Sequence, residues 1–441
     1  MVSSSFLKHP IPVGGEPRHV KSVTNMLIAR GHKVALTIDD QHLSSASMPG
    51  LDATFSPTLL FPRLVNKAFP IDLAVYVAFW RFLRSWRPDI VHLHACLDFS
   101  LVPIIVAARA GVPVVVTVHS SWPVCFRHGL CYNEDGSCVE RFSRRICSAC
   151  LAYGRRIENK RRVPIAVMSV ILLGAWWARR RVFRHVGRFI VPSAIVGRRI
   201  RDAGISTEQI SAIPYDLPTD DFSVRSWVAR PGGEGVRLLC VGRLEPGKGV
   251  QYLLHALREV CAVHPDLNLT LTVVGDGSFR PELEQLTASL DLRGAVRFIG
   301  AQLRSRLPDL YADTDLVVIP SLSEALPYVA LEAGTIGVPV VATHVGGIPE
   351  IFGNDAIIVP PMDATALARG ILAVLSDRDA ANTRAARARE RFRTNYGCDT
   401  MVNRIETVYA ELRDSKTQIA HRPRSDSEAA FTRSVDPKRH R

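Results

Sequence analysis

Short apolar runs alternate with amphipathic helical patterns along most of the chain. Near the N-terminus, Val20, Val23 and Leu27 fall on one face of a predicted helix, and Gly31 suits its end. Unbroken apolar strands that alternate with helices are typical of parallel sheets covered on both faces. The predicted strands are 2–7, 33–38, 89–94, 113–119 and 188–192 in the first half, and 237–241, 269–275, 296–300, 316–320, 339–343 and 356–359 in the second.

The pattern divides the chain into two parts. It breaks in a stretch rich in Asp, Ser, Pro and Gly, so we predict an α/β protein with two doubly wound, Rossmann-like domains, 1–220 and 236–413, joined by a hinge at 221–235. The polar, basic segment 414–441 is predicted to be a disordered tail. Ligands of such sheets bind at the carboxyl ends of the strands, so the expected site is the cleft between the domains.

Composition narrows the function classes. The 441 residues are 47% hydrophobic and 22% charged, which excludes wholesale disorder, and the net charge of +13 favours nucleic acid, an anionic membrane or a phosphorylated substrate as partner. Zinc-finger spacing, an RNA-binding aromatic motif and a helix-turn-helix pattern are absent, so a nucleic-acid-binding protein is the weaker alternative. Without a secretory-signal pattern or an apolar run of about 18 residues, and with nine cysteines, we expect a cytoplasmic protein with reduced thiols.

The strongest motif is 323–333, which directly follows the predicted strand 316–320. Pro327 suits the first turn of a helix, so Glu324 precedes that helix and Glu332 lies within it. Free N–H groups of a first helical turn bind phosphate, and carboxylates suit sugar hydroxyls. The alternative is two solvated glutamates at a helix start, where glutamate is favourable anyway. Neither carboxylate is expected in the core.

A second motif, 241–249, follows the first strand of the second half. Its Gly and Pro residues predict a loop at the carboxyl end of that strand, from which Arg243 and Lys248 can point into the cleft. Two cations beside a helix N-terminus would neutralise a pyrophosphate leaving group. The alternative is a surface turn with two solvated cations.

These motifs, together with 274–277 and 346–350, resemble those of glycosyltransferase family 4, whose members are retaining nucleotide-sugar transferases of the GT-B fold. The resemblance covers 1–413 and is strongest over 236–352. It implies transfer of a sugar from a nucleotide-sugar donor to a glycan or lipid-linked acceptor, with no cofactor required for catalysis. A GT-B nucleotide-sugar epimerase is the alternative among enzymes. Segment 213–218 stands where many members have an Asn-Gly pair, so no contact is carried over to it.

The resemblance also implies roles for single residues. Residues that match Arg243 and Lys248 hold the donor diphosphate in the family, and the one that matches Glu324 contacts the donor sugar at the catalytic centre. The other residues of this motif that match donor-binding positions are Ala325 and Leu326, through backbone amides, and Glu332, at the ribose.

The first half carries further matches to the family. Gly14 and Gly15 lie between the first predicted strand and helix, where members place a Gly pair against the donor phosphates and the acceptor. His119, at the end of strand 113–119, matches a histidine near the reacting sugar, and a structural role is its alternative. His92 and His94 are interpreted as structural.

Five cysteines cluster after His119. Cys147 and Cys150 have metal-ligand spacing, and other members of the cluster could complete a tetrahedral structural zinc site. A reduced or disulfide-bridged loop is the alternative. The other cysteines of the cluster are Cys125, Cys131 and Cys138.

The stretch 141–202 is strongly basic, with sixteen Arg and Lys residues and two acidic ones. It contains the apolar run 163–178, which Arg179, Arg180 and Arg181 follow. One interpretation is a buried helix of the first domain. The other is a helix that lies on an anionic membrane surface, with Trp at the interface, which would make the protein peripheral on the inner face of the plasma membrane.

Overall fold

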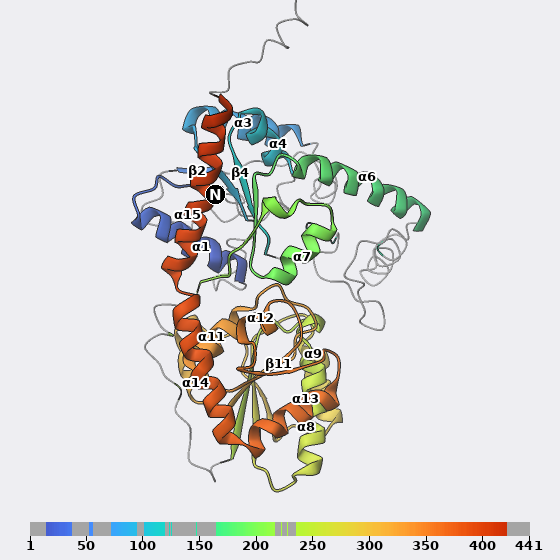
Figure 1. Cartoon of the computed structure of the whole chain (residues 1–441). Helices are drawn as coiled ribbons and strands as arrows, with labels where there is room; N and C mark the ends of the chain where they lie inside the picture. Colours follow the sequence, from blue (N-terminus) through green and yellow to red (C-terminus); the bar gives the residue numbers. More distant parts are fainter. Residues whose placement is uncertain are drawn as a thin grey trace, which may run out of the picture.

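The fold contains two separate parallel sheets, one in each half of the chain (Figure 1). The structure is a computed structural model that describes 15–37, 53–55, 72–94, 101–119, 165–216 and 235–420, together with Pro123, Cys125, Cys147, Phe222 and Trp227. The predicted strand 2–7 lies outside these residues.

The first half is built on a four-stranded parallel sheet of order β3-β4-β5-β6, beside a parallel pair β1-β2. The predicted strands 33–38, 89–94, 113–119 and 188–192 contain β1, β3, β4 and β5. The sequence did not predict β2, nor β6, whose partly exposed residues form no apolar run. The strands are β1 (Ala35–Thr37), β2 (Ala53–Phe55), β3 (Val91–Leu93), β4 (Val114–Thr117), β5 (Arg188–Val191) and β6 (Ile210–Ala212), and the helices are α1 (Gly15–Ala29), α3 (Leu73–Trp86), α4 (Val102–Arg109), α6 (Ile165–Phe183), α7 (Ala194–Asp202) and the short η2 (Thr207–Gln209).

The second half contains a six-stranded parallel sheet of order β12-β11-β10-β7-β8-β9. All six strands predicted there are confirmed within a residue or two of their ends. The strands are β7 (Val236–Val241), β8 (Leu269–Val274), β9 (Val296–Phe298), β10 (Leu316–Ile319), β11 (Val340–Thr343) and β12 (Ile357–Val359), and the helices are η3 (Pro246–Lys248), α8 (Val250–Val263), α9 (Arg280–Ser289), η4 (Arg304–Arg306), α10 (Leu307–Ala312), α11 (Tyr328–Ile336), α12 (Ile348–Phe352), α13 (Ala364–Ser376), α14 (Arg378–Asn395) and α15 (Cys398–Ala420).

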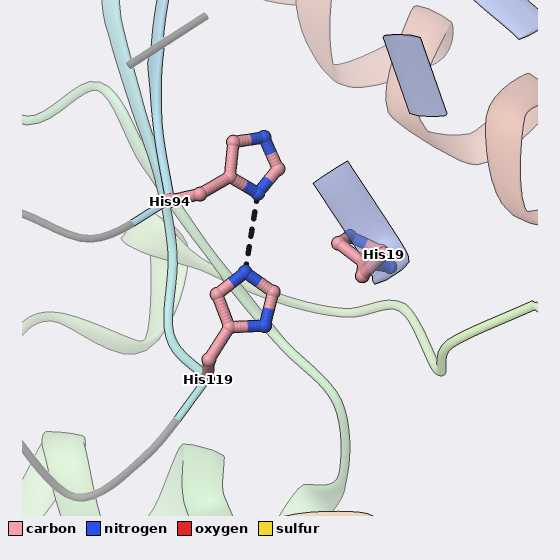
Figure 2. Close-up of side chains that lie close together, drawn as sticks. All are labelled: His19, His94 and His119. Carbon is pink, nitrogen blue, oxygen red and sulfur yellow. Dashed lines mark hydrogen bonds between the residues drawn. The ribbon is translucent and has the colours of Figure 1, made fainter. Parts of the chain in front are cut away.

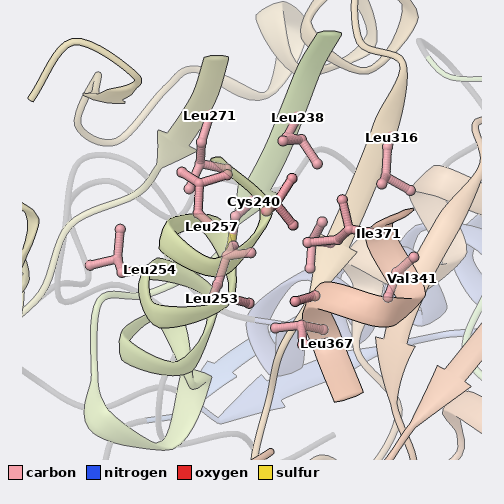
Figure 3. Packing of buried hydrophobic residues seen from close by; sticks show 14 of the residues in the cluster. Leu238, Cys240, Leu253, Leu254, Leu257, Leu271, Leu316, Val341, Leu367 and Ile371 are labelled. Atoms are coloured by element: carbon pink, nitrogen blue, oxygen red, sulfur yellow. The ribbon is translucent and has the colours of Figure 1, made fainter. Parts of the chain in front are cut away.

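One apolar core of the second half lies between this sheet and helices α8 and α13 (Figure 3). Leu253 and Leu257 are one turn apart on α8 and are fully buried against the sheet residues Leu238 and Leu271. Burying each such side chain stabilises the fold by about 1.5–3 kcal/mol. The apolar face of α8 therefore fixes the loop that precedes it, which carries Lys248.

The last helix, α15, packs against the first half of the chain. Residues Met401 and Ile405 of α15 are buried against Val23 and Ile190 of the first half, since the apolar residues of α15 recur on one helical face. Figure 1 shows α15, in red, running beside the first half. The helix continues to Ala420, so the predicted tail does not begin at 414.

The predicted hinge falls mostly outside the described residues. Phe222 is fully buried in a cluster of the second half, and the indole N–H of Trp227 donates to the Thr314 carbonyl at 2.7 Å. These two residues of 221–235 thus pack on the second half. The domain boundaries at 220 and 235 stay predictions.

Candidate active site

The two strongest motifs meet at the carboxyl ends of β7 and β10. These strands are hydrogen-bonded neighbours, and the strand order reverses direction between them, which is where doubly wound sheets bind ligands. Lys248 Nζ donates to Glu324 Oε1 at 2.6 Å, and Ser321 Oγ donates to the same oxygen at 2.8 Å. The sequence predicted both loops at this edge, and the structure brings their side chains into contact.

Glycines allow the backbones of these loops to approach closely. Gly249 has φ of +70°, and a Cβ at that position would collide with the carbonyl oxygen of Pro320. Gly346 has φ of +55°, and a Cβ there would collide with the carbonyl oxygen of Glu324. The loop that carries Glu324 is therefore held from both sides by positions that need glycine.

Arg243, the other cation of the second motif, is exposed. It follows β7 directly, and its side chain makes no ion pair with another residue in the part of the chain that the structure describes. Its guanidinium therefore keeps its donors available for an anionic ligand.

Glu332 departs from the expectation that neither motif carboxylate is buried. It lies in α11, only 4% exposed, and both its oxygens have partners. Arg18 Nη1 donates to Oε1 at 2.6 Å, and the hydroxyl of Tyr311 donates to Oε2 at 2.9 Å. The helix turns this glutamate inward, toward α1 and α10, rather than into solvent.

Arg18 is a residue of the site that the sequence analysis missed. It comes from the first turns of α1, and its guanidinium lies 3.9 Å from the centre of the Tyr328 ring, at the start of α11. A Cβ on Gly15 would lie 2.8 Å from Tyr328 Cδ2, so the N-termini of α1 and α11 are in contact. Arg18 Nη2 is buried without a hydrogen-bond partner among the described residues. The one sequence feature that could have indicated Arg18 is its position about one helical turn after the predicted pair Gly14 and Gly15.

His119 lies at the end of β4, as predicted, and its ring has two polar neighbours. Its Nε2 is 3.1 Å from Nδ1 of His94, and its Nδ1 is 2.9 Å from the hydroxyl of Tyr215 (Figure 2). Burial holds the pKa of both histidines well below the usual range, so the two rings are neutral at neutral pH. His94, interpreted as structural, directly contacts the predicted catalytic histidine.

A second group missed by the sequence analysis links the two halves. The Tyr215 ring stacks on Tyr328 with centroids 5.3 Å apart, and the Tyr328 hydroxyl donates to Asp216 Oδ1 at 3.2 Å. Burial would raise the pKa of Asp216, but the nearby His19 ring and the hydrogen bond from Ser22 outweigh it and lower the pKa. Asp216 is therefore a buried carboxylate at neutral pH, beside the start of α11.

Ala325 and Leu326 lie where the first half touches the Glu324 loop. The hydroxyl of Ser193 donates to the Ala325 carbonyl at 3.3 Å, and Leu326 is buried in the core of the second half. Nearby, the backbone N–H of Ala194 donates to Glu350 at 2.8 Å. Donor binding by the amides of Ala325 and Leu326 stays a prediction.

Several other predicted site residues are not described by the structure, or are described without their neighbours. Gly14, Cys131, Cys138 and Cys150 lie outside the described residues. Cys125 and Cys147 are each described without their neighbours in the chain. The cysteine zinc site and the role of Gly14 therefore stay predictions.

Helix α6 lies in the basic stretch 141–202. It has features expected of a buried helix and features expected of a helix on a membrane surface. Arg179 is 2% exposed, whereas Val170 and Trp177 are 71% and 57% exposed. Arg180 and Arg181 lie over the rings of Trp176 and Trp177, with 4.8 Å and 4.2 Å between guanidinium carbon and ring centroid. Among the described helices, none is long and apolar enough to cross a bilayer. Part of α6 is thus buried, and part presents apolar and basic side chains to solvent.

Known protein families match both halves of the chain. The family described as Glycosyltransferase Family 4 matches residues 13–215, and Glycosyl transferases group 1 matches 228–391. Glycogen synthase of Mycobacterium tuberculosis is 28% identical over 432 residues, which cover 93% of this chain and 94% of that protein.

Solved structures show the same fold. Sucrose-phosphate synthase from Thermosynechococcus elongatus superposes with a TM-score of 0.70 at 20% identity, covering 94% of this chain and 98% of that one. Anabaena HepE, solved in complex with UDP, superposes with a TM-score of 0.67 at 19% identity, covering 93% and 99%. The chain therefore belongs to glycosyltransferase family 4 and has the GT-B fold.

Proposed function

We propose that this glycosyltransferase moves a sugar, with retention of configuration, from a nucleotide-sugar donor to a glycan or lipid-linked acceptor. One observation carries the proposal: Lys248 and Glu324 are in contact at 2.6 Å where the strand order reverses, beside the N-terminus of α11. A cation, a carboxylate and free helical N–H groups at one point suit a sugar linked to a diphosphate.

Each side chain has a distinct task in the proposed reaction. Arg243 and Lys248 stabilise the negative charge that develops on the diphosphate as it leaves. Glu324 contacts Lys248, which is assigned to the diphosphate. Its carboxylate would therefore lie next to the sugar carbon that becomes positive. The acceptor hydroxyl then attacks from the face that the diphosphate leaves, and the leaving phosphate takes its proton. The protein positions the reactants and stabilises charge, and needs no covalent intermediate.

The nucleoside end of the donor is assigned to Glu332, because its carboxylate can accept hydrogen bonds from ribose hydroxyls. Arg18 and Tyr311 both donate to that carboxylate, so a donor bound there would share Glu332 with them or replace one of them. Anabaena HepE has been solved with UDP and with UDP-glucose. A uridine nucleotide is therefore the first probe for the base.

We assign binding of the acceptor to the first half of the chain. His119 at the end of β4 faces Tyr215 and is our candidate for a contact with the reacting sugar. The similarity to a glycogen synthase supports a glycan acceptor, whereas α6 supports a lipid-linked one. Val170, Leu173 and Trp177 share one exposed helical face, and Arg180 and Arg181 are exposed nearby.

We propose that this face of α6 binds an anionic membrane surface from the cytoplasmic side, with Trp177 at the interface. In Figure 1, α6 extends away from the sheet of the first half, in green. A peripheral position on the inner face of the plasma membrane would bring a lipid-linked acceptor to the cleft.

Thermal-shift measurements test the donor assignment. UDP, UDP-glucose, GDP-mannose and ADP-glucose are added separately to purified protein, because a ligand that binds only the native state raises its melting temperature. We expect at least one nucleotide sugar to stabilise the wild type and to stabilise the Lys248→Ala variant less. Exposed Arg258 on α8 provides a matched control, Arg258→Ala, which should respond like the wild type. No shift with any nucleotide sugar would contradict the proposal.

A further inference from the structure

Arg18 and Glu332 place a hydrogen-bond donor and an acceptor side by side. Arg18 lies near the start of α1, and Glu332 lies within α11 of the other half. The guanidinium Nη1 donates to Glu332 Oε1 at 2.6 Å, and the hydroxyl of Tyr311 donates to Oε2 at 2.9 Å. A carboxylate has about four acceptor sites, so each oxygen can accept a further hydrogen bond.

The other terminal nitrogen of Arg18 is a buried donor. Nη2 has no hydrogen-bond partner among the described residues. The guanidinium lies over the Tyr328 ring, with 3.9 Å between Cζ and the ring centroid, so the ring fixes its plane and leaves the N–H groups at its edge. Buried donors in native proteins are nearly always satisfied, and an exception indicates a group that binds there.

A vicinal diol complements this pair of side chains. Each hydroxyl of a ribose both donates and accepts, so it can donate to the carboxylate while it accepts from the guanidinium. Both contacts are charge-assisted and therefore stronger than hydrogen bonds between neutral groups. A nucleoside that lacks the hydroxyl leaves these charged groups without that partner, which is the basis on which a polar site rejects an analogue.

We propose that Arg18 binds the donor ribose together with Glu332, through its Nη2. The inference rests on the proposed function, in which Glu332 is assigned to the ribose, and it makes the first half of the chain part of the nucleotide site. Glu332 lies four residues after Tyr328, the first residue of α11, which is about 6 Å along the helix axis. The proposed phosphate site lies at the N-terminus of α11, so the order along the helix is that of a nucleoside diphosphate.

Nucleotides that differ by one hydroxyl test the proposal. UDP, GDP, ADP and CDP are titrated into the full chain by isothermal titration calorimetry, and the tightest of them is compared with its 2′-deoxy and 3′-deoxy forms. We expect the wild type to prefer the ribonucleotide over at least one deoxy form by about tenfold, the factor that corresponds to one charge-assisted hydrogen bond.

Substitution of Arg18 then shows whether this residue is responsible. Arg18→Met should raise the Kd of the ribonucleotide about tenfold and leave the Kd of the less favoured deoxy form nearly unchanged, so the preference is lost. Arg18→Lys keeps the positive charge but not the forked pair of N–H donors, so it should also lose the preference while it remains folded.

Two controls separate ribose recognition from other effects. Lys248→Ala should weaken the ribonucleotide and the deoxy form by the same factor, because Lys248 is assigned to the diphosphate. Arg30, which directly follows α1, makes a similar ion pair of 2.6 Å with Glu406 of α15, so Arg30→Met is the matched loss of an ion pair. It should bind both nucleotides as the wild type does.

The outcomes distinguish this inference from the proposed function. If Arg18→Met or Arg18→Lys is folded by circular dichroism and keeps the wild-type preference, Arg18 is only a structural partner of Glu332, and the inference is wrong while the proposed function stands. A wild type without a preference for the ribonucleotide, or an Arg18→Lys variant that does not fold, overturns the inference in the same way. If the wild type binds none of the four nucleotides, the proposed function fails and the inference fails with it.

Discussion

Arg18 of α1 and Glu332 of α11 form an ion pair of 2.6 Å that joins the two halves of the chain. The side chains are 17% and 5% exposed, and the hydroxyl of Tyr311 donates to the second carboxylate oxygen. The carboxylate that the family resemblance assigns to the ribose is thus the one that accepts from both Arg18 and Tyr311. On the proposed assignment of Glu332 to the ribose, donor binding and the contact between the halves would share one carboxylate.

The first prediction concerns the energy of this pair. Glu332→Gln should destabilise the protein by about 3–5 kcal/mol, because it leaves the guanidinium of Arg18 buried and uncompensated. The double variant Arg18→Met, Glu332→Gln should lose less than the sum of the two single variants, with a coupling of roughly 0.5–3 kcal/mol. Urea unfolding of the four proteins measures this. Additive losses would mean that the two side chains do not interact in solution.

The second prediction concerns the two cations near the proposed diphosphate. Arg243→Ala and Lys248→Ala should each weaken the binding of a nucleoside diphosphate by about 1.5–3 kcal/mol, because each removes a charge-assisted contact. Isothermal titration calorimetry with the nucleotide found by thermal shift measures the change.

Lys248→Ala should also cost some stability, since it removes a cation 2.6 Å from the Glu324 carboxylate, whereas Arg243 is exposed. Arg258→Ala again serves as the control. If both variants bind the nucleotide as tightly as the wild type, these residues are surface cations and the phosphate role is wrong.

The sequence predicted those parts of the site that come from the strand ends of a single sheet, the sheet of the second half. Lys248 and Glu324 could be placed together because the carboxyl ends of parallel strands share an edge, and the apolar runs located those strands. The order of the six strands was not needed for that inference. Gly249 and Gly346, which have positive φ angles, then let their backbones approach the loop that carries Glu324.

The missed residues depend on packing between the halves. Arg18 and Asp216 lie far from the second-half motifs in sequence, and no local pattern says that α1 will meet α11. The burial of Glu332 was missed in part for the same reason, because one of its two partners, Arg18, comes from the other half, and the other, Tyr311, lies 21 residues away in α10. The return of α15 to the first half was likewise not predicted, since the apolar face of a helix does not say which domain it packs against.

The third prediction concerns the membrane. Wild-type protein should co-sediment with vesicles that contain phosphatidylserine and less with neutral vesicles, and high salt should release part of it. Arg180→Gln, Arg181→Gln should reduce the anionic preference, and Trp177→Ala should reduce binding to both kinds of vesicle. Arg179 is buried, so it is left intact in these variants. Equal recovery of the wild type with both vesicle types would favour α6 as a helix without a membrane role.

The last prediction separates the two motif glutamates. A contact made only in the transition state affects turnover, whereas one made equally with bound substrate affects the Michaelis constant. Glu324 lies with Lys248 at the proposed reacting centre, so Glu324→Gln should lower kcat by at least tenfold with little change in donor KM. Glu332 lies along α11, so Glu332→Gln should mainly raise donor KM.

The measurement is steady-state transfer, or slow hydrolysis of the donor where the acceptor is unknown, at a temperature at which both variants remain folded. This condition matters because Glu332 is buried and Glu324 is not fully so. The conservative variants Glu324→Asp and Glu332→Asp keep the charge and should recover part of the lost function only where charge is what matters. If Glu324→Gln turns over like the wild type while Glu332→Gln is inactive but folded, the two roles are reversed. If neither variant changes the kinetics, the carboxyl ends of β7 and β10 are not the site of transfer, because neither carboxylate proposed to face the sugar or the ribose would then contribute to it.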